Sequence, residues 1–125
     1  MAMAPRQFEE FCAALLSRVG FEVELTKATR DGGADLLCIS RLGDIPIKMA
    51  VEIKRYKESR PITVSMVRSF VGANAEFKAN KLVYLTTSSY TAPAKAYATD
   101  CVGHLLSLKQ YDQIQEWCKS ALRQG

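Results

Sequence analysis

Histidine is nearly absent from this chain of 125 residues, in which His104 is the single copy. His104 comes directly before Leu105 and Leu106, a context that predicts the start of a strand rather than a catalytic loop. This scarcity argues against nucleophilic or acid–base catalysis by histidine. Chemistry in this protein would use mainly carboxylates and lysines, with which a hard metal ion is compatible.

Cysteine is also scarce and scattered. The four cysteines form no C-x-x-C pair, and a single histidine cannot complete the usual zinc-site spacings. We therefore expect reduced thiols that act as small apolar residues in an intracellular protein. The residues concerned are Cys12, Cys38, Cys101 and Cys118.

Long hydrophobic runs are missing. No apolar stretch approaches the roughly 18 residues that span a bilayer. The segment from Met1 to Phe11 has no apolar region of the kind found in secretory signals. We therefore expect a cytoplasmic protein with no membrane role.

The composition is that of an ordinary globular protein, with 48% hydrophobic and 24% charged residues. A chain of this length suits one domain over residues 1–125. Lysine and arginine number 17 against 13 aspartates and glutamates, which gives a net charge of +4. This excess is a mild bias toward an anionic partner.

The hydrophobic periodicity predicts helices that alternate with strands in the second half of the chain. The first three strands should form a largely antiparallel meander, and the later ones should add in parallel. The predicted helices cover 5–20, 61–81, 93–99 and 111–122, the last with Ile114, Trp117, Cys118 and Leu122 facing inward; the predicted strands cover 21–26, 34–40, 45–56, 82–85 and 105–108.

Three ionisable residues fall on adjacent predicted strands. Asp35 lies at the start of the second strand, and Glu52 and Lys54 lie near the end of the third, on one face. If these strands pair as a hairpin, Asp35 should lie beside Glu52 and Lys54. Two close carboxylates repel each other, and a divalent cation such as Mg²⁺ relieves that repulsion. A Glu-x-Lys pair on a strand is more often only part of a solvated face. The prediction of a metal site therefore depends on the combination of this pair with a carboxylate that follows a Gly-Gly turn.

Four segments together resemble a known family. They are Phe8-Glu9 with Leu15-Leu16 and Gly20-Phe21, then DGGAD at 31–35, VEIK at 51–54 and LTTSSYT at 85–91. In this order they are similar to the Mrr-like restriction endonucleases of the PD-(D/E)XK nuclease superfamily, over about Phe8 to Thr99. The resemblance implies a three-layer α/β/α domain of the restriction-endonuclease type, with a central mixed sheet of about five strands.

The resemblance also implies a set of site residues. Asp35, Glu52 and Ile53 would bind Mg²⁺, with Mn²⁺ as a substitute, and Lys54 would assist the attacking water. Glu9 would add an outer carboxylate, although a glutamate near a helix N-terminus is also favoured by the helix dipole alone. Two departures are visible: Ala34 replaces the proline of the superfamily motif, and Glu52 stands where many Mrr-like proteins carry Gln.

Positive charge gathers just beyond these residues. Arg55, Tyr56, Lys57 and Arg60 are candidate DNA-binding residues, because phosphate contacts require cations. Tyr56 could stack on a base or pack on the second helix. Thr87 and Ser88 could donate to a phosphate, or the hydroxyl-rich loop could cap the following helix.

The sequence therefore predicts a divalent-metal-dependent DNA endonuclease that hydrolyses phosphodiester bonds. Two alternatives stay open: a structure-selective nuclease like the Holliday-junction resolvases, and a non-catalytic nucleic-acid-binding module on the same fold. We expect a homodimer, because cutting two strands with one site per chain is most simply done by a twofold dimer. A separate DNA-recognition domain or subunit is a further expected partner.

Overall fold

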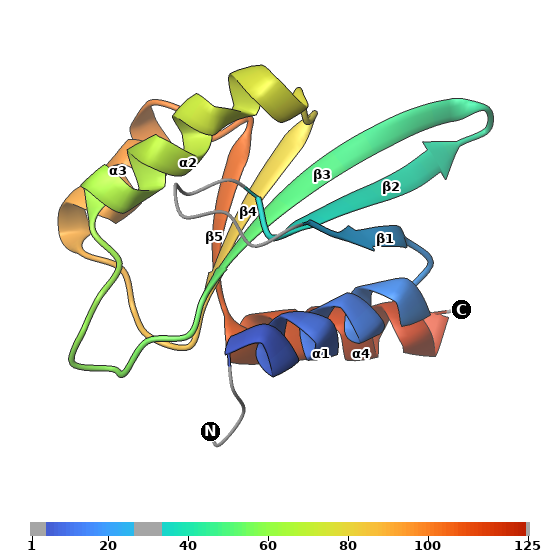
Figure 1. The fold of residues 1–125 in the computed structure, drawn as a ribbon, viewed down its shortest axis with the longest axis horizontal. Coiled ribbons are helices and arrows are strands. Elements are labelled where there is room, and N and C mark those ends of the chain that lie inside the picture. The colour runs from blue at the N-terminus through green and yellow to red at the C-terminus, as the bar shows by residue number, and fades with distance from the viewer. Residues whose placement is uncertain (1–4, 27–33, 125) are drawn as a thin grey trace.

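The computed structural model describes residues 5–26 and 34–124, without the side chains of Pro5, Trp117, Cys118 and residues 121–124. The described chain begins and ends with a helix, and helices also separate the later strands in the sequence (Figure 1). The elements are α1 (Pro5–Arg18), β1 (Glu22–Leu25), β2 (Leu36–Leu42), β3 (Ile45–Lys54), α2 (Val64–Phe77), β4 (Lys81–Thr86), α3 (Ala92–Asp100), β5 (Leu106–Gln110) and α4 (Tyr111–Gln124).

The five strands form one mixed sheet in the order β1-β2-β3-β4-β5. The first three strands are antiparallel, and β4 and β5 add to β3 in parallel. Figure 1 shows α2 and α3 on one face of the sheet and α1 and α4 on the other. The predicted three-layer α/β/α fold with its mixed five-stranded sheet is therefore confirmed.

Each face of the sheet has its own apolar cluster, because successive strand residues point to opposite faces. Phe8, Cys12 and Leu16 of α1 are buried against Leu36 and Val51. The opposite cluster is formed by buried residues of α2 and α3 with the sheet, namely Val67, Phe70, Ala94 and Ala98 with Ala50, Leu82 and Tyr84. Two sealed faces leave the strand ends as the exposed positions where a site can form.

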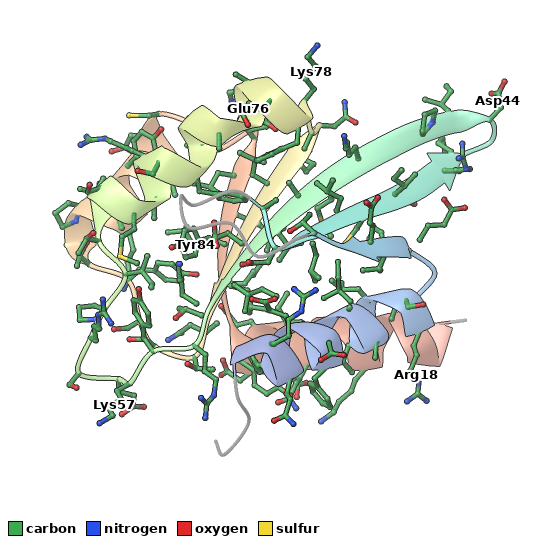
Figure 2. All side chains as sticks on the ribbon, viewed as in Figure 1. Arg18, Asp44, Lys57, Glu76, Lys78 and Tyr84 are labelled. Atoms are coloured by element: carbon green, nitrogen blue, oxygen red, sulfur yellow. The ribbon has the colours of Figure 1, made fainter. Side chains whose placement is uncertain are left out.

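The β2–β3 hairpin extends beyond its neighbours, and Figure 2 shows Asp44 at its tip. The pairing with β1 stops at Ile39, and the pairing with β4 starts only at Met49. The distal part therefore has no covering layer, and Leu42, Ile45 and Ile47 are exposed there. The opposite end of the hairpin, where β2 begins and β3 ends, is the one that carries Asp35, Glu52 and Lys54.

Several local predictions need adjustment. The second helix ends at Phe77 and not at Asn80 and Lys81, because Lys78 adopts a left-handed conformation with φ of 52°. The second strand covers Leu36–Leu42 and not 34–40, so Asp35 lies directly before it and not inside it. The inward position of Ile114 is confirmed by its burial, whereas the side chains of Trp117, Cys118 and Leu122 lie outside the described part of the chain.

Cys38 and Cys101 are free thiols. Cys12 and Cys38 are buried as predicted, and burial raises the pKa of the Cys38 thiol to about 12, so it stays protonated and behaves as an apolar group. Cys101 is exposed, contrary to that expectation. Among the described residues, no helix combines the length and apolar character needed to cross a bilayer.

Candidate active site

The antiparallel pairing of β2 with β3 brings Asp35 beside the end of β3. Leu36 is the partner of Val51, so Asp35 lies next to Glu52. The main-chain N–H of Ile53 donates a hydrogen bond of 2.6 Å to Oδ2 of Asp35. The N–H of Asp35 in turn donates to the carbonyl of Val51 at 2.8 Å. The Asp35 carboxylate is therefore fixed in direction by the strand on which Glu52 lies.

Glu52 is a buried carboxyl group with a like charge beside it. Glu52 as a whole residue is only 3% exposed. Burial raises the pKa of Glu52 well above its usual range, and the hydrogen bond and negative charge of Asp35 raise it further; Lys54 acts in the opposite direction. Negative charge on both Asp35 and Glu52 is therefore unfavourable in this position, and a bound cation would stabilise it.

Lys54 follows Glu52 by two residues, so both side chains leave the same face of β3. Its main-chain carbonyl accepts a hydrogen bond of 2.7 Å from the hydroxyl of Thr86 on β4, which fixes the strand end. Among the described residues, none hydrogen-bonds to the Lys54 ammonium group. The structure therefore brings Asp35, Glu52 and Lys54 together at one end of the hairpin, as the spacing predicts.

Glu9 reaches this carboxylate pair from α1. Its pKa is raised above its usual value by burial first and by the charge of Asp35 next, while Arg6 lowers it. The first turn of α1 contains no acidic residue, so Glu9 lies beyond the short range of the helix dipole. The helix dipole therefore does not account for Glu9, and its role as an outer carboxylate stays a prediction.

Ile53 can offer a metal only its main-chain carbonyl, because its side chain is apolar and buried. In a strand, the N–H and C=O of one residue point to the same side. Since the N–H of Ile53 meets Asp35, its carbonyl also faces the edge on which Asp35 lies. This orientation is compatible with the expected ligand role of the Ile53 carbonyl, which stays a prediction.

The basic segment after β3 forms a loop that returns toward the sheet. Lys57 and Arg60 are exposed, whereas Arg55 and Tyr56 are half-buried. The Arg60 guanidinium lies 4.0 Å from the centre of the Tyr56 ring. This cation–π contact gives Tyr56 an intramolecular partner and keeps Arg60 close to the strand end.

Thr87 and Ser88 hold that loop in place. The Thr87 hydroxyl donates to the carbonyl of Tyr56 and the Ser88 hydroxyl to the carbonyl of Arg60, both at 2.8 Å. Ser88 is buried, so its hydroxyl anchors the basic loop to the protein interior. The helix cap anticipated in this region is Thr91, whose side chain accepts from the N–H of Ala94. A direct contact of Thr87 or Ser88 with DNA stays a prediction.

Residues 31–33 of the DGGAD motif lie outside the described part of the chain.

Arg6 and Thr26 also contact residues of the site, and neither was predicted from the sequence. Nη1 of Arg6 lies 2.8 Å from Oε1 of Glu9 and donates at 3.3 Å to the carbonyl of Thr26. The spacing of Arg6 and Glu9 on a helix could have indicated the ion pair, but the contact with Thr26 depends on the tertiary structure.

The fold and the carboxylate pair at the hairpin end are features of a restriction-endonuclease-like domain. The model of the Mrr catalytic family, described as "Restriction endonuclease", matches residues 1–118. The chain therefore belongs to this restriction endonuclease family.

Individual proteins agree with this assignment. The chain is 30% identical over 114 residues to the type IV methyl-directed restriction enzyme EcoKMrr of Escherichia coli K12, with 85% of this chain and 36% of that protein covered. The chain spans about a third of the length of the curated relatives it matches.

Two solved structures share the fold at lower identity. The DNA modification-dependent restriction endonuclease AspBHI has a TM-score of 0.68 at 24% identity, with 97% of this chain and 36% of that chain covered. The MspJI restriction endonuclease in complex with a 27-mer oligonucleotide has a TM-score of 0.67 at 19% identity, with 86% and 26% covered.

Proposed function

We propose that the chain is the catalytic domain of a divalent-metal-dependent DNA endonuclease of the PD-(D/E)XK type, which hydrolyses phosphodiester bonds. The observation that carries this proposal is the half-buried Asp35 beside the buried Glu52, with Lys54 on the same strand face as Glu52. Membership in a restriction endonuclease family supports it.

The donors at this site fit Mg²⁺, with Mn²⁺ as a substitute. Asp35, Glu52 and the carbonyl of Ile53 would hold the ion, and all three supply hard oxygen ligands. The described residues contain no group of three or more His, Cys, Asp or Glu side chains placed to hold a metal. Few protein ligands suit Mg²⁺, which usually keeps several waters. Bound there, the ion would lower the pKa of a water and polarise a phosphoryl oxygen.

Other residues of the chain would orient a metal ligand, assist the reaction and bind the DNA. The N–H of Ile53 orients the Asp35 carboxylate, so this ligand needs little reorganisation. Lys54 would orient the attacking water or stabilise the charge that develops on the phosphate. The loop with Lys57 and Arg60 would hold the DNA backbone next to the strand end.

A plasmid-nicking assay tests the proposal. We expect cleavage that requires Mg²⁺ or Mn²⁺ and stops with a chelator. Gel retardation without cleavage under all these conditions would favour the non-catalytic binding module. Cleavage of branched DNA alone would favour the structure-selective nuclease, so linear, branched, methylated and single-stranded substrates belong in the same assay.

The basic loop gives a prediction for DNA binding. We expect affinity for duplex DNA to fall steeply with salt. Lys57→Ala and Arg60→Ala should each reduce the slope of log K against log salt by about 0.9 for every phosphate that the side chain neutralises in the parent protein. Fluorescence anisotropy at several salt concentrations measures this slope.

Arg18→Ala is the matched control for the loop variants. It removes one positive charge from the last turn of α1, and Figure 2 shows Arg18 and Lys57 far apart in the molecule. It should leave the slope unchanged. An equal effect of all three variants would mean that only net charge matters and that the loop has no special role.

We also propose a homodimer on DNA, since one active site per chain must serve two strands. Sedimentation of the protein with a cleavable duplex should show two chains per DNA. Rapid double-strand cleavage by a species that sediments only as a monomer would contradict this proposal. Site choice would fall to a separate domain or subunit, in keeping with the greater length of the relatives.

A further inference from the structure

Arg6 connects α1 with the residue that follows β1. Its Nη1 atom lies 2.8 Å from Oε1 of Glu9, one turn along α1, and donates at 3.3 Å to the carbonyl of Thr26 just after β1. The side chain of Arg6 is 49% exposed and that of Glu9 is 16% exposed. An ordinary surface ion pair has two solvated partners and contributes little, whereas here one partner is turned inward and a second element is bonded.

Thr26 continues this connection to Asp35. Its N–H donates to the Asp35 carbonyl at 3.0 Å. Its hydroxyl lies 2.5 Å from the carbonyl of Ala34 and 3.2 Å from that of Asp35. Thr26 therefore binds the main chain that carries Asp35, and Arg6 binds Thr26. Hydrogen bonds through Thr26 therefore join the first turn of α1 to the main chain of Ala34 and Asp35.

We propose that Arg6 is a positioning residue of the active site: its contact with Thr26 fixes the guanidinium group, and the guanidinium group holds Glu9 beside Asp35. This inference rests on the proposed nuclease function. Arg6 would act through Glu9 and would not touch the DNA or the reacting phosphate. Arginine suits the task because one guanidinium nitrogen carries two N–H donors and the group stays charged.

A double-mutant cycle tests this dependence. Arg6→Gln and Glu9→Gln are each expected to lower the cleavage rate at saturating DNA by roughly tenfold, as for partners within one ion-pair network. If Arg6 acts through Glu9, the double variant should be no slower than Glu9→Gln alone. Arg6→Lys should recover most of the rate, because it keeps the positive charge and its ammonium group carries three N–H donors.

The control is Arg18→Gln, which removes the same charge from the other end of α1. It should leave the rate unchanged. Affinity for DNA should be the same in the parent and in Arg6→Gln, since a positioning role changes the rate at saturation and not binding.

Three results would overturn the inference while the parent enzyme still cleaves DNA. The effects of Arg6→Gln and Glu9→Gln could multiply independently, Arg6→Gln could cleave like the parent, or it could only weaken DNA binding, as a phosphate contact would. A parent that neither cleaves DNA nor binds Mn²⁺ in calorimetry would instead overturn the proposed function, and the inference with it. If the parent binds Mn²⁺ without cleaving, the same cycle is read in Mn²⁺ affinity, and absence of coupling there overturns the inference.

Discussion

Lys54→Ala should retain the bound metal and lose DNA cleavage by roughly 100-fold or more. A preorganised charge at the reacting centre typically contributes a few kcal/mol, and each 1.4 kcal/mol is about tenfold in rate. Lys54 lowers the pKa of Glu52, so its ammonium lies within electrostatic reach of the carboxylates. Removing that positive charge should leave Mn²⁺ affinity unchanged or slightly increased. Calorimetry and plasmid nicking on the same preparation measure the two quantities.

Asp35→Asn is the counterpart of Lys54→Ala in this comparison. It should abolish both tight metal binding and cleavage, because it removes a ligand whose direction is fixed by Ile53. DNA binding should survive, since a carboxylate that repels phosphate is gone.

Lys95→Ala, on the exposed surface of α3, is the control for removal of one charge. It should change neither quantity. Full cleavage by Asp35→Asn would show that the site is elsewhere, and failure of Lys54→Ala to bind metal would contradict the assigned role of the lysine.

The sequence is most informative where chemistry follows from local spacing. Alternation along β3 places Glu52 and Lys54 on one face, and a hairpin brings Asp35 to them, so this cluster could be predicted from residue order alone. The three layers could also be predicted, because apolar strands need helices packed on both faces of the sheet.

Tertiary contacts between distant segments were not predictable in the same way. Thr87 and Ser88 suggested a phosphate loop or a helix cap, yet their hydroxyls reach the carbonyls of Tyr56 and Arg60, which lie about thirty positions earlier. The contact of Arg6 with Thr26 has no signal in the sequence, because it exists only where α1 packs against the end of β1. Hydroxyl and guanidinium groups have many possible acceptors, and spacing alone does not choose among them.

Glu52→Gln should make the metal-free protein more stable at neutral and alkaline pH. Burial and the neighbouring Asp35 raise the pKa of Glu52 above its ordinary value of 4.5. A carboxyl group with a raised pKa in the folded state binds its proton more tightly there than in the unfolded chain. Its contribution to stability is complete below the unfolded pKa and is lost as the pH rises through the folded pKa. Glutamine is neutral at every pH and avoids this loss.

The expected difference between parent and Glu52→Gln is therefore small at pH 5 and grows to about 1–3 kcal/mol near pH 8. Urea unfolding in the presence of a chelator at both pH values measures it. Glu24→Gln, which alters an exposed carboxylate on β1, should not change the pH dependence. Added Mg²⁺ should stabilise the parent at pH 8 but not Glu52→Gln, because only the parent keeps both carboxylate ligands. If Glu52→Gln instead destabilises the metal-free protein at pH 8, then Glu52 is already compensated within the chain, and the electrostatic argument for a cation at this site fails.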